Sequence, residues 1–143
     1  MDALAYIQGR SGLRGTVRFS QRKDGTLVTA RILGLPPDGF FAFHIHDGPD
    51  CGGVEYANTG GHFNPANHPH PSHAGDLPPL LSCHGKAYLS MLTDRFAVTE
   101  IIGKTVVIHS GPDDFRSQPA GNAGEKIACG LILGYPRDSS KYP

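Results

Sequence analysis

The stretch that decides the fold is GFFAFHIH, residues Gly39–His46. Side chains alternate across a β-strand, so Phe41 and Phe43 are expected on one face. His44 and His46 then lie on the opposite face, about 7 Å apart along the strand. One face therefore supplies a hydrophobic core, and the other supplies two imidazoles that can converge on one metal ion.

Short strands flank this segment on both sides. The residue pattern predicts short strands at 3–8, 15–21, about 26–33, 86–92 and 97–101, and the largely apolar stretches 105–109 and 127–133 predict buried strands. Many short strands separated by turns favour an all-β sandwich or barrel. The 19 glycines, 12 prolines and absence of tryptophan agree with this fold class. At 143 residues the chain is expected to form one domain, residues 1–143.

Two long segments interrupt the strand pattern. Residues 47–81 are rich in Gly, Pro, Asn and Asp and contain four histidines, whereas residues 110–126 follow His109 directly. A structureless loop as long as the first is uncommon in a compact domain unless it is functional or disordered. Bound metal would supply the order that packing cannot. The first loop contains the ligands of a tetrahedral zinc site, namely His62, His70, His73 and Asp76.

A polar, histidine-rich surface loop is the plain alternative to a metal site. A His-x-His pair alone is a weak signal, because strand histidines are often satisfied by hydrogen bonds. A surface loop is less favoured because both groups occur in one small chain. One group is the strand pair His44 and His46, and the other is the loop cluster around His62. Six of the eight histidines have a ligand role in this scheme, which leaves His68 and His84 as surface residues.

The charge balance gives no indication of a nucleic-acid or membrane partner. The formal net charge is zero, and no long run of like charges occurs. No secretory signal and no run of 18 apolar residues is visible, so we expect a cytoplasmic protein. A secreted protein already trimmed of its signal would have a sequence of the same kind.

Among three cysteines at most one internal disulfide can form, and spacing alone does not choose the pair.

Seven short stretches stand out in the chain, namely FHIH (43–46), GHFNP (61–65), HAGDL (73–77), GKTVVIH (103–109), PDD (112–114), GNAG (121–124) and IACG (127–130). Together they resemble the copper/zinc superoxide dismutases. The resemblance covers about residues 14 to 134 in the family's order, and the stretches are highly specific together where any one would be weak.

The resemblance implies a flattened eight-stranded Greek-key β-barrel, an immunoglobulin-like sandwich, with the metals held outside it between two long loops. It implies copper ligands His44, His46, His62 and His109, and zinc ligands His62, His70, His73 and Asp76. His62 would therefore bridge the two metals. His70 is preferred over His68 because the family places this ligand eight residues after the bridging histidine. His68 in its place would also complete the set of zinc ligands.

Three further roles follow from the resemblance. Asp113 matches the family's aspartate that links a copper ligand to a zinc ligand by hydrogen bonds, here His44 and His70. Cys51 and Cys129 match its intramolecular disulfide. Cys83 would then be a free thiol, and such thiols are more often buried and inert than reactive.

The chain departs from the family pattern at one functional position. The family's active-site arginine falls on Lys126, three residues before Cys129. Lysine keeps the positive charge but lacks the planar multi-donor fork, so superoxide would be guided and held less well and the rate would be lower. The alternative is that Lys126 is a solvated surface charge. Both metal-site loops are also short, with only two residues between His70 and His73.

The resemblance therefore implies an oxidoreductase that converts superoxide to dioxygen and hydrogen peroxide through a copper bridged by His62 to a structural zinc. The expected partners are the superoxide anion and a copper source or chaperone, and the oligomeric state is open between monomer and homodimer. One alternative is a non-catalytic, dismutase-like protein that stores or transfers copper and zinc. Another is a structural zinc module whose histidine strand receives no copper.

Overall fold

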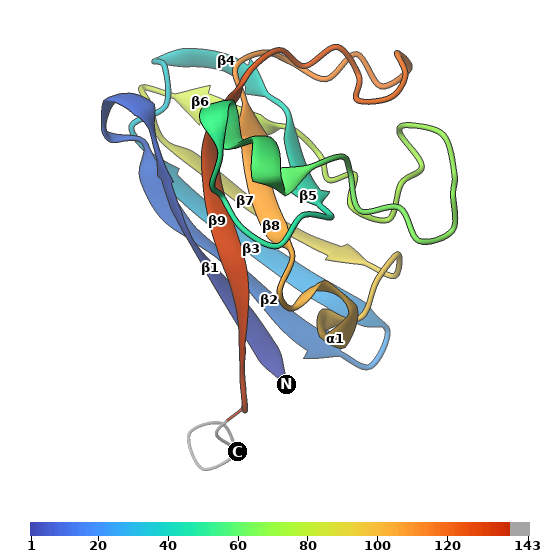
Figure 1. Ribbon diagram of the computed structural model, residues 1–143. Coiled ribbons are helices and arrows are strands. Elements are labelled where there is room, and N and C mark those ends of the chain that lie inside the picture. Colours follow the sequence, from blue (N-terminus) through green and yellow to red (C-terminus); the bar gives the residue numbers. More distant parts are fainter. Residues whose placement is uncertain (138–143) are drawn as a thin grey trace.

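The computed structural model describes residues 1–137 and is built almost entirely of antiparallel strands (Figure 1). The strands are β1 (Asp2–Gly9), β2 (Arg14–Arg22), β3 (Gly25–Leu33), β4 (Asp38–Phe41), β5 (Phe43–His46), β6 (Leu80–Cys83), β7 (Ala87–Thr93), β8 (Thr105–His109) and β9 (Lys126–Tyr135). The short helices are the 3₁₀ segments η1 (Arg10–Gly12) and η2 (Val54–Thr59), and the α-helix α1 (Val98–Ile101).

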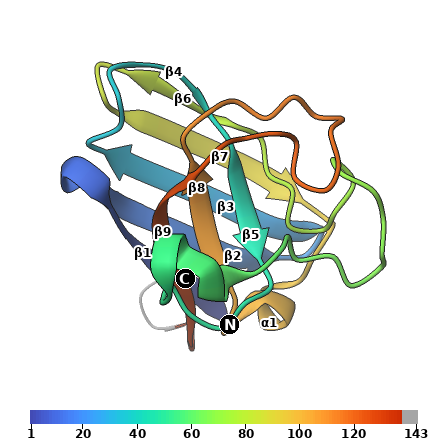
Figure 2. The same ribbon diagram turned by 45° about the horizontal axis from the view of Figure 1, so that its top comes forward.

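One sheet curls back on itself to form the barrel (Figures 1 and 2). Seven strands pair in the order β5-β8-β9-β1-β2-β3-β7, and β4 pairs separately with β6. The chain passes from β4 into β5 through Ala42, and from β6 into β7 through the turn after Cys83, so the β4–β6 ribbon connects the two ends of the sheet. The predicted all-β barrel is confirmed. The structure has nine strands because the strand that contains Gly39–His46 is interrupted at Ala42.

Three details of the sequence-based expectation were wrong. Residues 98–101 form α1 instead of a strand, because Val98 and Ile101 bury a helical i, i+3 pair and the Glu100 carboxylate accepts from the Ala97 N–H. Residues 80–83 form β6, where a loop was expected up to residue 81. Cys83 is exposed, since side chains alternate along β6 and Leu80 takes the inward position.

The two faces of β5 have different surroundings. Phe43 and Ile45 belong to the hydrophobic core inside the barrel, where they are fully buried. His44 and His46 alternate with them and point out of the barrel, yet both are buried as well. The long loops cover this outer face, so the barrel wall gives the histidines a rigid base and the loops remove them from water.

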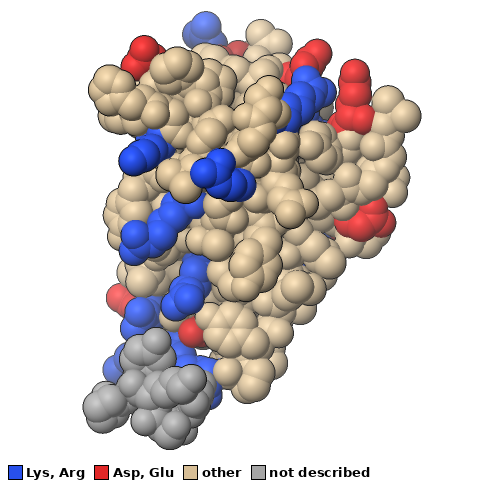
Figure 3. Space-filling model, turned by 90° about the vertical axis from the view of Figure 1, so that its left-hand side faces the viewer, with Lys and Arg blue, Asp and Glu red and all other residues tan. Residues whose placement is uncertain are grey.

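The opposite side of the barrel carries a basic outer face. Arg14, Arg18 and Arg22 take alternate outward positions on β2, and Arg31 on β3 lies between the first two in the sheet register. All four side chains are exposed, and none of the ion pairs among residues 1–137 involves them. Figure 3 shows the side of the molecule that lies at the left in Figure 1, away from the long loops, and several Lys and Arg side chains gather along the left of this view.

A disulfide anchors the first long loop to the barrel. Cys51 and Cys129 are bonded across 78 residues, with their Cα atoms 5.8 Å apart. Cys129 lies on β9, and η2 follows Cys51 and packs in front of β9 (Figure 1). The predicted pairing of these two cysteines is confirmed.

No helix in residues 1–137 is long and apolar enough to cross a membrane.

Replacing Cys51 with Ser should lower the free energy of unfolding by about 4 kcal/mol in the chain-entropy model of a crosslink this long. Urea unfolding of the oxidised protein measures this loss. Cys83→Ser is the matched control, because the exposed Cys83 thiol makes no disulfide. Equal stability of the Cys51→Ser variant and the native protein would show that the crosslink does not restrain the unfolded chain.

Candidate metal centre

The candidate metal centre lies outside the barrel wall, between the two long loops (Figure 2). Three of its histidines stand on adjacent paired strands, with His44 and His46 on β5 and His109 at the end of β8. His62 comes from the first loop and lies opposite His46 through a short antiparallel bridge. The strand positions explain why these side chains converge, since neighbouring strands hold them at a fixed spacing.

Four of the imidazoles form the first cluster, which comprises His44, His46, His62 and His109. Their ligand atoms lie within 4.8 Å of one another. The Nε2 atoms of His46 and His109 are 3.3 Å apart. His46 Nδ1–H donates to the Gly60 carbonyl (2.8 Å), which leaves Nε2 as a bare lone pair. This cluster can hold one cation through nitrogen ligands alone.

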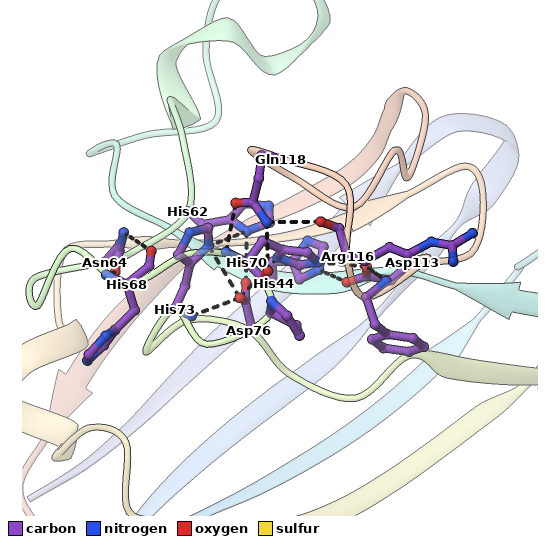
Figure 4. Close-up of polar contacts among 12 residues, drawn as sticks. His44, His62, Asn64, His68, His70, His73, Asp76, Asp113, Arg116 and Gln118 are labelled. Carbon is purple, nitrogen blue, oxygen red and sulfur yellow. Dashed lines mark hydrogen bonds and ion pairs between the residues drawn. The ribbon is translucent and has the colours of Figure 1, made fainter.

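The second cluster consists of His62, His70, His73 and Asp76 (Figure 4). Nδ1 of His62 lies 3.1 Å from Nδ1 of His73 and 2.8 Å from Oδ1 of Asp76. The other carboxylate oxygen of Asp76 lies 3.0 Å from His70 Nδ1 and 3.2 Å from His73 Nδ1. Three nitrogens and one carboxylate around a common point match the donor set of a zinc site.

His62 belongs to both clusters. Its Nδ1 atom faces the second cluster, and its Nε2 atom is buried without a hydrogen-bond partner. The ring centroid of His62 lies 4.0 Å from that of His44 and 5.1 Å from that of His73. One imidazole is therefore placed to offer a different nitrogen to each of two cations.

Asp113 connects the two clusters from the second loop. Its Oδ2 atom lies 2.8 Å from His44 Nε2, and its Oδ1 atom lies 2.7 Å from His70 Nε2. Each histidine donates to this carboxylate through Nε2, so each turns Nδ1 toward its own cluster. Gly121 permits the close approach, because it has a positive φ of 75° and a side chain there would overlap Asp113 Oδ1 and His70 Nε2.

Burial keeps the strand histidines uncharged at neutral pH. Loss of solvent lowers the pKa of His44 and of His46 to about 2 and the pKa of His109 to about 4, and neighbouring imidazoles contribute to each shift. For Asp76, burial raises the pKa, but the hydrogen bond from His62 and the surrounding imidazoles outweigh it and lower the pKa overall. Neutral imidazoles and an ionised carboxylate are the forms that bind metal cations.

The unsatisfied atoms show that the residues fit two metal ions. His44 Nδ1, His62 Nε2 and His70 Nδ1 are buried ring nitrogens without a hydrogen-bond partner in residues 1–137, since the contact of Asp76 Oδ2 with His70 Nδ1 at 3.0 Å is close but is not a hydrogen bond. Such orphaned atoms are costly in a buried setting unless something binds them. All three belong to the two clusters, so a cation in each cluster would satisfy them.

Lys126 lies at the edge of the first cluster. Its Nζ atom donates to Thr59 Oγ1 (2.7 Å) and to the Gly60 carbonyl (3.0 Å). The Gly60 carbonyl also accepts from His46. Lys126 and His46 therefore share one acceptor, which holds the ammonium group next to the first cluster. Partial burial lowers the pKa of Lys126.

The other sequence-based candidates are also placed by the structure. His68 and His84 are exposed, and Figure 4 shows the His68 ring directed away from the other histidines. The Asn64 side chain donates to the His68 carbonyl and accepts from the His68 N–H, which holds this part of the loop in that orientation. Sequence reasoning missed Gln118 and Arg95, both of which bond to the backbone around His70 and His73. No local motif marks them.

The chain matches the family model of copper/zinc superoxide dismutase (SODC) over residues 13–132. It is 35% identical over 133 residues to superoxide dismutase [Cu-Zn] 2 of Aquifex aeolicus, covering 82% of this chain and 78% of that protein. It is 37% identical over 150 residues to superoxide dismutase [Cu-Zn] 3 of Arabidopsis thaliana, covering 92% of this chain and 90% of that protein.

Similar solved structures are SOD-like proteins. A double mutant of a SOD-like protein from Bacillus subtilis superposes with a TM-score of 0.80 at 31% identity, covering 92% of this chain and 97% of that chain. The SOD-like protein itself gives a TM-score of 0.79 at 28% identity, covering 91% and 97% of the two chains. The barrel, the two histidine clusters and these relatives agree, and the chain belongs to the copper/zinc superoxide dismutase family, whose metals are copper and zinc.

Proposed function

We propose that this protein is a copper/zinc superoxide dismutase. Copper would be held by His44, His46, His62 and His109, and zinc by His62, His70, His73 and Asp76. The observation that carries this assignment is the placement of His62, which turns a different ring nitrogen toward each cluster. The chemistry of the donors agrees, because all-imidazole sites suit copper and an imidazole–carboxylate set suits zinc.

The balanced reaction is the conversion of two superoxide ions and two protons to dioxygen and hydrogen peroxide. Bound copper would supply the one-electron redox chemistry, by which one superoxide is oxidised and the next is reduced. His62 Nε2 is the buried ring atom on the copper side, where it can carry one of the two protons. His62 Nδ1 stays fixed by the zinc side, so the ring keeps its orientation while the proton comes and goes.

Lys126 would attract the substrate. Its ammonium group is held near His46 through the shared Gly60 carbonyl. An anion approaching the first cluster therefore meets a positive charge at the entrance. The basic outer face lies on β2 and β3, whereas the copper-side histidines lie on β5 and β8, so Lys126 is the basic residue placed beside the first cluster.

A second candidate is a non-catalytic protein that binds copper and zinc. Two observations favour it. The relatives with solved structures from Bacillus subtilis are named SOD-like, and Lys126 stands where the family has arginine. The complete pair of clusters is compatible with both candidates, so turnover is the quantity that separates them.

The deciding experiment is pulse radiolysis of superoxide decay on protein whose copper and zinc contents are measured on the same sample. We expect a second-order rate within about tenfold of the diffusional ceiling of roughly 10⁸ to 10⁹ M⁻¹s⁻¹. The rate should rise in proportion to bound copper. Full copper occupancy with negligible turnover would reject the enzyme and favour the metal-binding alternative.

Replacing Lys126 with Gln should lower the dismutation rate by roughly threefold to tenfold, because one local charge is removed from the anion's path. The rate of the variant should also depend less on salt concentration. Arg18→Gln is the matched control, since it removes one charge from the far side of the barrel, and its rate should equal that of the native protein. Equal losses in both variants would show that only net charge matters.

Replacing Asp113 with Asn should weaken metal binding by about 10- to 100-fold, because the carboxylate orients one histidine in each cluster. Competition with a chelator measures the affinity for each metal. The neighbouring residue gives the control, because the Asp114 carboxylate accepts only within its own turn, from Arg116 and Ser117. Asp114→Asn should therefore bind both metals as the native protein does, and a similar loss there would argue against the bridge.

A further inference from the structure

The zinc-side ligands lie on a segment with no regular secondary structure. His70 and His73 are separated by two residues, and no strand or helix includes residues 60–79. The copper-side residues His44, His46 and His109 lie on strands instead. A loop that must bring two imidazoles to one point loses more conformational entropy on ordering than a strand does. Contacts from outside the loop are therefore needed to hold it.

Gln118 makes a reciprocal bond with the backbone of His70. The His70 N–H donates to Gln118 Oε1 (2.9 Å), and Gln118 Nε2 donates to the His70 carbonyl (2.8 Å). The two residues are 48 positions apart, so this pair joins the second loop to the first (Figure 4). The amide thereby fixes both polar groups of a ligand residue's backbone.

Arg95 holds the same segment at its other end. Its Nη1 atom donates to the Pro71 carbonyl (2.9 Å) and to the His73 carbonyl (3.2 Å). Arg95 lies two residues after the end of β7, and its backbone N–H donates to the Thr93 hydroxyl. The guanidinium therefore ties the loop to the end of a barrel strand.

The two side chains add to hydrogen bonds made within the loop. The Ser72 N–H donates to the Pro69 carbonyl, the His73 N–H donates to Asp76 Oδ2, and the His73 carbonyl accepts from the Asp76 N–H. The carbonyls of His70 and Pro71 accept from Gln118 and Arg95, and the His73 carbonyl accepts from Arg95 as well. Residues 70–73 are therefore held from outside by Gln118 and Arg95 through the backbone, and by Asp113 through the His70 ring.

We propose that Gln118 and Arg95 are positioning residues for zinc. They hold residues 70–73 in the shape that brings His70 and His73 together, so that zinc binds without first having to order the loop. Neither side chain touches the ring nitrogens, and both act through the backbone. This inference rests on the proposed assignment of His70 and His73 as zinc ligands.

The test measures zinc affinity of copper-free protein by chelator competition, for the native protein, Gln118→Ala and Arg95→Ala. Each variant should bind zinc about tenfold more weakly, the effect of losing one or two hydrogen bonds to the backbone. The visible spectrum of Co²⁺ bound in place of zinc reports ligand geometry, and it should change in both variants. Copper affinity measured on the same variants should stay within about twofold of the native value, because the strand histidines are untouched.

Matched controls and conservative variants separate positioning from general damage. Gln8→Ala and Arg18→Ala remove an exposed side chain of the same type without a hydrogen-bond partner in residues 1–137, and their zinc affinity should be native. Gln118→Glu keeps the size and one acceptor but sets an oxygen against the His70 carbonyl. It should weaken zinc binding as much as the Ala variant does, whereas rescue by Glu would mean that Gln118 only fills space.

Two outcomes overturn different claims. If the native protein does not bind zinc at one equivalent, the assignment of the zinc ligands is wrong. If it binds zinc and both Ala variants keep native affinity and native Co²⁺ spectra, the ligands stand and the positioning role is rejected. Equal losses in the Gln8→Ala and Arg18→Ala controls would also reject it.

Discussion

Ring nitrogens that face one another are the constraint on which the rest of the structure depends. His46 and His109 bring two Nε2 atoms to 3.3 Å, and His62 and His73 bring two Nδ1 atoms to 3.1 Å. One ring N–H can donate across each of these distances, but His44 Nδ1, His62 Nε2 and His70 Nδ1 are left buried without a hydrogen-bond partner in residues 1–137. A cation in each cluster would satisfy these nitrogens. The barrel wall, the covering loops and the Asp113 carboxylate all serve to keep these atoms together.

The two halves of the metal centre are held in different ways. The paired strands β5 and β8 fix the positions of His44, His46 and His109, because backbone hydrogen bonds set the spacing of the strands. The residues around His70 have no such ladder and depend on side chains from elsewhere in the chain. The first half therefore keeps its geometry through the backbone ladder, and the second half keeps its geometry through the bonds that Gln118 and Arg95 make.

The sequence predicted most of the strands well, because their physical cause is local. Alternation within Gly39–His46 places Phe43 inside and His44 outside, and the structure agrees. The brief strand β6 and the helix α1 were missed because four residues are too few to show a period, and tertiary packing decides their conformation. Gln118 and Arg95 could not be predicted, because their partners lie 22 to 48 residues away and the bonds go to backbone atoms, which carry no sequence signal.

The basic outer face concentrates positive charge on one side of the barrel in spite of the zero net charge of the chain. Residues 1–37 carry six basic and two acidic residues. Arg14, Arg18, Arg22 and Arg31 are exposed together on β2 and β3, and none of them forms an ion pair in residues 1–137. Such a molecule can be retained by a cation exchanger even at its isoelectric pH, because the resin interacts with one face and not with the average charge.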